Sequence, residues 1–187
     1  DRVYNTVKKG FKDKMNLQFL KPFGYNNTYA VAVRKDTAKQ YNLKVIYDAA
    51  HAFGVTYNDK SILQYGDISV MSFHATKIFH SIEGGALIIN DDDLYQKVTR
   101  LINFGITGPD HIEDLGINAK MNEFQAAMGI CNLRHVDNEI AKRKVVVERY
   151  NELLSGIEGI KLTGVQEGVK SNYAYYPVLF DGYKKSR

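Results

Sequence analysis

Three short apolar runs that lie close together in the chain restrict the folds open to this sequence. "LKVIYDAA" (43–50), "DISVMSF" (67–73) and "GALIIND" (85–91) are rich in β-branched and other strand-forming residues. Such runs are typical of strands, and the first predicts a buried parallel strand, preceded by the end of a helix at 34–42. Too few residues separate the second and third runs for a crossover helix. An antiparallel excursion is therefore expected inside an otherwise parallel sheet.

The remaining segments predict helices and one further strand. Residues 91–105 begin with acids, carry apolar side chains at helical spacing and end at a glycine, which predicts a helix. Residues 121–156 predict either two helices bent near Asp137 or one long helix. Between these helices, the glycines and proline of 108–120 indicate a loop. "SNYAYYPVLFD" (171–181) predicts a final, more open strand.

Composition excludes several classes of protein. The 187 residues are 44% hydrophobic, enough for a sizeable core, and the formal net charge of +4 is scattered along the chain. Scattered charge favours anionic small molecules as ligands and argues against nucleic acid. The single cysteine, Cys131, has neither a disulfide partner nor metal-ligand spacing, so a reducing, cytoplasmic setting is expected. No run is long and apolar enough for a bilayer or a signal peptide, which predicts a soluble protein without membrane contact.

Chemically capable side chains follow two of the predicted strands. Asp48 ends the first strand, His51 comes three residues later, and Lys77 follows the second strand. Ligand-binding residues of parallel sheets gather at the carboxyl ends of strands. An acid that keeps a pyridine nitrogen protonated, an imidazole beside the ring and a lysine that forms a Schiff base together meet the demands of pyridoxal phosphate (PLP). By itself, Asp48 also fits a turn or a helix cap.

The segments "YDAAHAFG" (47–54) and "SFHATKIFHSIEGGALI" (72–88) resemble the DegT/DnrJ-type nucleotide-sugar aminotransferases, which are fold type I PLP enzymes. The resemblance runs over residues 42–156 and, more weakly, to about residue 181. It implies an α/β fold: a three-layer sandwich whose mostly parallel sheet belongs to the large domain, followed by the start of a smaller C-terminal α+β lobe.

The resemblance also implies a division of the chain. Residues 1–41 form an N-terminal segment that matches the family poorly, 42–136 form part of the PLP-binding large domain, and 137–187 form a connecting helix and the truncated start of the small domain. The family's Gly-Thr-x-Ala turn, which binds the cofactor phosphate at a helix N-terminus, has no counterpart in 1–41. The chain is therefore expected to be the central part of a longer enzyme, as a fragment, a cleaved product or the ordered part.

By the same resemblance, Lys77 is the Schiff-base lysine and shuttles the proton between substrate and cofactor. Asp48 pairs with the pyridine nitrogen, and His51 lies against the ring. Ser72 donates to the cofactor phosphate, although its hydroxyl could also simply satisfy the backbone at a strand end. Lys77 and Asp48 are thus the expected catalytic residues, and all four are expected to bind the cofactor. No metal site is expected.

The segment "LGINAKMNEF" (115–124) resembles a family segment whose asparagine reaches the cofactor phosphate of the neighbouring subunit. Asn118 holds the matching position, which implies a homodimer with active sites at the interface. Asn118 could alternatively cap the following helix.

Other polar and aromatic residues near these motifs have structural interpretations. His74 is expected to be structural or close to the substrate. Glu83, Gly84 and Gly85 are expected to form a tight turn in which glycine lets the backbone approach the lysine. A cluster of tyrosines is expected to lie in the core of the small domain and not to form a platform for a sugar: Tyr173, Tyr175 and Tyr176.

The function implied by the resemblance is transfer of an amino group, with glutamate as donor, to a keto group of a nucleotide-linked deoxysugar. Alternatives within the same fold are a sugar dehydratase, in which histidine replaces the lysine, and a desulfurase, which needs a cysteine on a mobile loop. Cys131 lies instead in a predicted helix. Two further alternatives are an inactive fragment that acts as a cofactor-binding or oligomerisation module, and a sugar-nucleotide-binding domain without a cofactor.

Overall fold

The computed structural model describes residues 35–182, and the chain divides after Val45 into two compact units. In the first unit, α2 (Lys35–Gln40) ends in a turn where the backbone N–H of Leu43 donates to the carbonyl of Ala38 at 2.8 Å. This confirms the predicted helix end. Most of the N-terminal segment discussed above lies outside the described residues.

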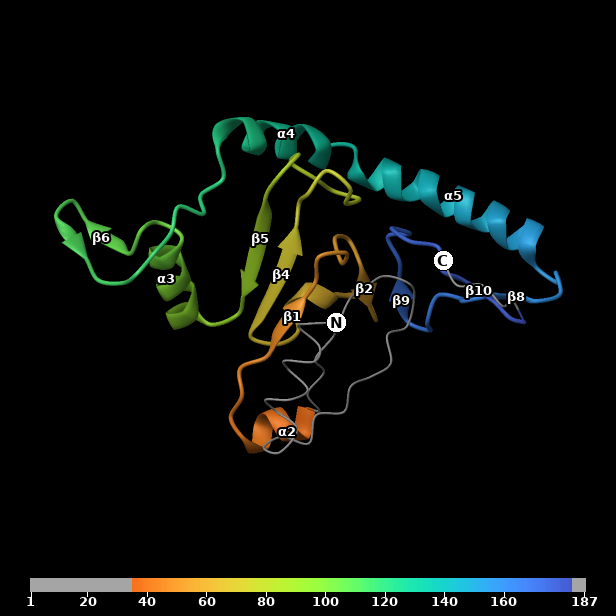
Figure 1. Ribbon diagram of the computed structural model, residues 1–187, viewed down its shortest axis with the longest axis horizontal. Coiled ribbons are helices and arrows are strands. Elements are labelled where there is room, and N and C mark those ends of the chain that lie inside the picture. The colour runs from red at the N-terminus through yellow and green to blue at the C-terminus, as the bar shows by residue number, and fades with distance from the viewer. Residues whose placement is uncertain (1–34, 183–187) are drawn as a thin grey trace. The chain divides into compact units, whose positions relative to one another are not determined.

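A three-stranded sheet forms the centre of the second unit (Figure 1). The strands β1 (Ile46–Asp48), β4 (Ile68–Ser72) and β5 (Gly85–Ile89) lie in the order β1-β4-β5, with β4 parallel to β1 and antiparallel to β5. The predicted strands and the antiparallel excursion are confirmed. The prediction that the first strand is buried is wrong, because β1 is paired on one side only in the described sheet and Tyr47 is 48% exposed. We call residues 73–84, between β4 and β5, the lysine loop.

The predicted helices are present, although α3 ends at Leu101, before the predicted stop at Gly105. α3 (Asp92–Leu101) starts at the cap residue Asp91, whose carboxylate accepts a hydrogen bond from the N–H of Leu94 at 2.9 Å. α4 (Glu123–Leu133) and α5 (Val136–Leu154) are separate helices, which confirms the first of the two readings of this segment.

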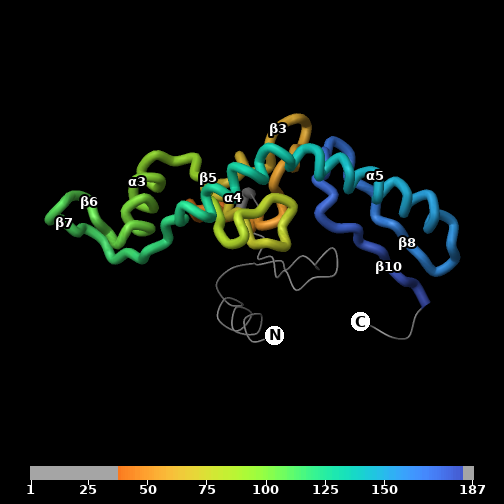
Figure 2. Tube along the Cα trace, turned by 90° about the horizontal axis from the view of Figure 1, so that it is seen from above, coloured from red at the N-terminus to blue at the C-terminus, as the bar shows by residue number. Residues whose placement is uncertain are grey.

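The helix α4 lies beside the lysine loop (Figures 1 and 2). The side-chain amide of Asn132 donates to the carbonyl of His80 at 2.9 Å. At Gly129, an added Cβ would lie 3.7 Å from the Cβ of Ser81, which is ordinary contact distance. Inside the loop, the ring of Phe79 is buried and stacks on that of Phe53 with centroids 4.4 Å apart. The loop is thus packed between α4 and the aromatic core.

Short strands complete the second unit. The predicted strand at 171–181 is present only at its end, because Asn172 and its neighbours form a turn through the asparagine side chain. The predicted loop at 108–120 includes part of a short hairpin. These elements are β2 (Thr56–Tyr57), β3 (Lys60–Ser61), the 3-10 helix η1 (Ile62–Gln64), β6 (Ile106–Gly108), β7 (His111–Ile112), β8 (Ile160–Leu162), β9 (Val169–Lys170) and β10 (Val178–Phe180).

Among the described helices, none has both the length and the apolar character needed to cross a membrane.

Candidate active site

Lys77 and His51 meet at the carboxyl ends of the parallel strands. The backbone N–H of Lys77 donates to the carbonyl of His74 at 2.9 Å, which makes a turn in the lysine loop. The Lys77 Nζ lies 3.4 Å from Nδ1 and 3.5 Å from Nε2 of His51. If Lys77 Nζ lay in the plane of the imidazole at equal distances from both ring nitrogens, it would collide with the ring carbons. The amine therefore lies over the face of the imidazole.

Asp48 ends β1 and begins the turn that carries His51. Its Oδ1 accepts a hydrogen bond from the N–H of Ala50 at 3.0 Å. Asp48 therefore does stabilise a turn, which was the structural alternative for this acid. Within the described part of the chain, its second oxygen accepts no hydrogen bond and remains able to accept one from a ligand.

The electrostatic environment keeps His51 neutral. Burial lowers its pKa below the ordinary value of 6.5, and the positive charge of Lys77 lowers it further. The carboxylate of Asp48 acts in the opposite direction. Lys77 and Asp48 thus both act on the same ring, which is uncharged near neutral pH.

Two residues near the C-terminal end of the chain contact His51 and were not predicted as site residues. The buried side chain of Asn172 donates to the carbonyls of His51 at 2.9 Å and Phe53 at 2.8 Å. The ring of Tyr175 is perpendicular to the imidazole, with centroids 4.7 Å apart. Tyr175 is 53% exposed, so the expectation that it lies in the core is wrong. In the sequence, the only sign of these contacts was the tyrosine cluster that includes Tyr175.

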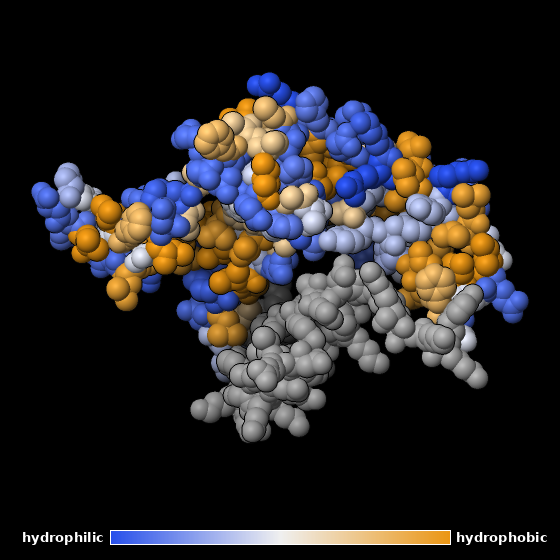
Figure 3. Space-filling model, turned by 45° about the horizontal axis from the view of Figure 1, so that its top comes forward, coloured by the Kyte–Doolittle hydropathy of each residue, from blue (hydrophilic) through white to orange (hydrophobic). Residues whose placement is uncertain are grey.

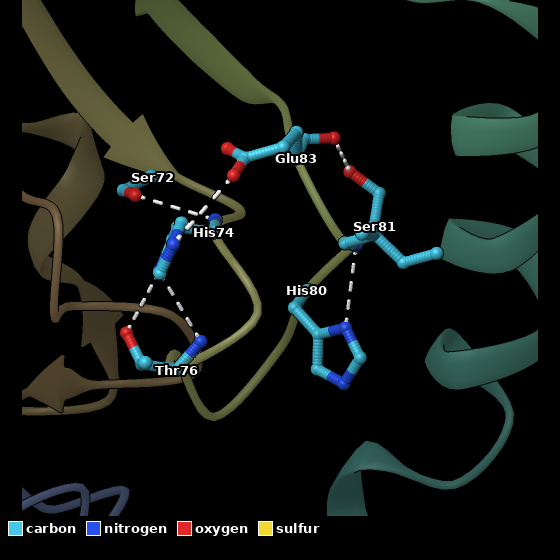
Figure 4. A network of polar contacts seen from close by, with 7 residues as sticks. Ser72, His74, Thr76, His80, Ser81 and Glu83 are labelled. Carbon is cyan, nitrogen blue, oxygen red and sulfur yellow. Dashed lines mark hydrogen bonds and ion pairs between the residues drawn. The ribbon is translucent and has the colours of Figure 1, made fainter.

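Ser72 and His74 belong to a polar network along the lysine loop (Figure 4). The Oγ of Ser72 accepts a hydrogen bond from the N–H of His74 at 3.4 Å, which leaves its hydroxyl hydrogen able to donate to a ligand. The His74 ring contacts Thr76 Oγ1 at 2.9 Å and Glu83 Oε1 at 3.6 Å. These contacts fit the structural reading of His74.

The Glu-Gly-Gly turn ends the lysine loop. The backbone N–H of Phe73 donates to the carbonyl of Gly84 at 2.8 Å, and Gly84 has a φ of 145°. An added Cβ on Gly84 would lie 2.6 Å from the Oγ of Ser81, and one on Gly85 would lie 2.7 Å from the carbonyl oxygen of Met71. The expected tight turn is present, and both positions require glycine.

Asn118 lies in the exposed segment before α4. Its Oδ1 accepts a hydrogen bond from Lys120 Nζ at 2.9 Å, and that ammonium lies 4.5 Å from the centre of the Phe104 ring. The cap of α4 is Asn122, in a capping box with Gln125, so the helix-cap reading of Asn118 is wrong. Among the described residues, no hydrogen bond or ion pair links Asn118 to Lys77 or His51.

A cavity of about 520 Å³ opens beside Asp48. Neither Lys77 nor His51 lines it. Its wall is largely apolar and consists of Tyr47, Asp48, Ala49, Ala52, Val55, Tyr57, Ile62, Tyr65, Gln166 and Val169.

The residues at Lys77 fit PLP. A flat ring carried on Nζ and parallel to the imidazole of His51 would lie near the 3.4 to 3.5 Å at which Nζ itself lies from the ring nitrogens. This is close to the contact distance of about 3.5 Å between stacked carbon atoms. Asp48 offers a carboxylate oxygen, and Ser72 offers a hydroxyl donor for a phosphate.

Solved aminotransferases of fold type I share this fold. The structure of DesI in the presence of its TDP-sugar product matches with a TM-score of 0.73 and 33% identity, over 79% of this chain and 38% of that one. Spr1654 of Streptococcus pneumoniae, solved in its PLP form, matches with a TM-score of 0.69 and 26% identity, over 82% of this chain and 41% of that one.

The chain belongs to the DegT/DnrJ/EryC1/StrS aminotransferase family, which it matches over residues 27–187. It is 44% identical over 158 residues to the dTDP-4-amino-4,6-dideoxy-D-glucose transaminase of Shigella dysenteriae. That match covers 84% of this chain and 43% of the relative, so the chain spans less than half the length of this relative.

Proposed function

We propose that the protein is a PLP-dependent aminotransferase that transfers an amino group, from glutamate, to the keto group of a sugar linked to a nucleotide. The observation that carries the proposal is the Lys77 amine held over the imidazole of His51, on the turn that begins at Asp48. The transaminase of Shigella dysenteriae, 44% identical, supports the sugar-nucleotide class of substrate.

Each site residue has a distinct proposed task. When bound, PLP supplies an electron sink for the bonds of the amino carbon. Lys77 Nζ holds the cofactor and afterwards accepts and returns the proton of the substrate carbon. With PLP bound, Asp48 would pair with the pyridine nitrogen, and His51 would support the ring face. Ser72 donates its hydroxyl hydrogen to the cofactor phosphate.

We further propose the finer architecture that the family resemblance implies. Residues 42–136 contribute to a PLP-binding large domain built as a three-layer sandwich around a mostly parallel sheet, and 137–187 begin the small domain. Asn118, on its exposed segment, reaches the cofactor phosphate of a second copy in a cytoplasmic homodimer. Lys120 donates to the amide oxygen of Asn118, and within the described part of the chain no hydrogen bond uses the amide hydrogens, which supports this assignment.

Lys77→Ala tests the proposed function in the full-length protein. After incubation with PLP, borohydride reduction and intact-mass measurement, the wild type should carry one covalently attached cofactor, and Lys77→Ala should carry none. Lys60→Ala is the matched control, because this exposed lysine contacts the ring of Tyr65 instead of the site. A variant that lacks Lys77 and still retains the cofactor mass and its visible absorbance band would remove Lys77 from this role.

A further inference from the structure

The side-chain amide of Asn172 forms hydrogen bonds through both its nitrogen and its oxygen, and these bonds join two distant parts of the chain. Its two amide hydrogens go to the carbonyls of His51 and Phe53, and its oxygen accepts the N–H of Ala174 at 3.0 Å. The residue is 4% exposed, so water has little access to replace these bonds. Removing the amide would leave two carbonyls of the His51 turn without these donors.

The backbone beside Asn172 is strained, which shows that the surrounding contacts fix this turn. Tyr173 has a φ of 54°, in the left-handed region that a bulky residue rarely adopts. The turn places Tyr175 with its ring perpendicular to His51. His51 is thus held through its backbone by Asn172 and through its ring by Tyr175.

We propose that Asn172 is a positioning residue for the Lys77 site: its amide fixes the turn that carries His51 and so holds the imidazole face over which the Lys77 amine lies. The effect on cofactor binding rests on the proposed function. The fixing of His51 does not, because the hydrogen bonds that carry it join protein groups alone.

The test replaces Asn172 with leucine, which has a similar shape and no hydrogen-bond donors. Asn151→Leu is the matched control, because Asn151 accepts a hydrogen bond from the Tyr176 hydroxyl at 2.8 Å and so tethers the same segment to α5 instead of to His51. The first readout is the His51 pKa in the cofactor-free full-length protein, followed by NMR of the ring and assigned with His51→Gln. The second is PLP affinity, followed by absorbance titration.

In Asn172→Leu the His51 pKa is expected to rise toward 6.5, because the released ring becomes hydrated and moves away from the Lys77 charge. PLP affinity should fall about tenfold, the size expected for the loss of one or two hydrogen bonds. Asn151→Leu should keep the wild-type values of both. A general loss of stability would lower the melting temperature without shifting the His51 pKa of the folded protein.

A wild-type His51 pKa in folded Asn172→Leu, or a raised pKa with unchanged PLP affinity, would overturn the proposal. If Asn172→Leu does not fold, Asn172→Ser gives the same comparison with a smaller effect, because its hydroxyl still donates one hydrogen bond; an unchanged His51 pKa there would also overturn it. A wild type that binds no PLP contradicts the proposed function instead, and the pKa comparison still decides whether Asn172 positions His51.

Discussion

His51 links the site to the stability of the fold through its protonation. In the folded protein its pKa lies below 6.5 because the ring is partly buried and Lys77 is close. In the unfolded chain the ring regains its ordinary pKa. Between these two values the unfolded state binds more protons than the folded state, so stability rises with pH.

The contribution of His51 should therefore be complete above about pH 6.5 and be lost as the pH falls through the lowered pKa. In His51→Gln, the melting temperature should decline less between pH 8 and pH 5 than in the wild type. His111→Gln is the control, since His111 lies on β7 and contacts Glu113 instead of Lys77. Equal declines in wild type and His51→Gln would contradict the linkage.

At this scale, spacing in the sequence predicted that Lys77 and His51 would meet, because neighbouring parallel strands end at the same edge of a sheet. Asn172 was not predictable. It lies 121 residues from His51, and nothing in the local sequence says which carbonyls a buried amide will find. Tyr175 was assigned to the core because a tyrosine suits a core and a site edge equally well.

At the scale of elements, the lysine loop depends on its terminal glycine. Gly84→Ala should lower the free energy of unfolding by about 1 to 3 kcal/mol, because the left-handed backbone and the contact 2.6 Å from Ser81 Oγ both oppose a Cβ. Gly129→Ala is the matched control on α4, where the added Cβ has ordinary contacts and helix propensity favours alanine by about 0.5 to 1 kcal/mol. Urea unfolding of both variants measures the difference. A neutral effect of Gly84→Ala would show that the turn can relax.

The long helices were predictable, because their apolar spacing and the acid before α3 are local signals. The break before α5 was only one of two alternatives, because neither glycine nor proline marks it in the sequence. The structure of the segment 171–181 was not predictable. Its aromatic residues and Val178 suggest a strand, but the Asn172 side chain accepts the backbone N–H of Ala174 and so forms a turn. The hairpin of β6 and β7 is too short to give a recognisable pattern.

At the scale of the whole molecule, much apolar surface remains exposed. In the described part of the second unit, the buried apolar side chains are Ala49, Ala52, Met71, Phe79 and Val136. Leu115 is 95% exposed and Phe124 88% exposed, and hydrophobic side chains also gather over α5, β8 and β10 (Figure 3). The α/β class of the fold was predictable from the resemblance of the motifs to the family, but this exposure was not, because a sequence pattern does not say which apolar surface a neighbouring segment covers.

A polypeptide of these 187 residues is therefore expected to self-associate, through exposed apolar patches and the edge of β1 that no other described strand pairs with. Sedimentation velocity should show species heavier than the monomer. Phe124→Asp should weaken the association, whereas Asn138→Asp, which adds the same charge at an exposed polar position on α5, should not. A monomer over the whole concentration range would contradict this expectation.

The place of the Lys77 amine over the imidazole face also limits the route by which its proton leaves. A neutral imidazole accepts a proton through the lone pair of a ring nitrogen, which lies in the ring plane. The ammonium is aligned with neither lone pair. His51 thus supports the amine from below without acting as its base, and the proton released when the amine becomes nucleophilic passes to an acceptor other than the His51 ring.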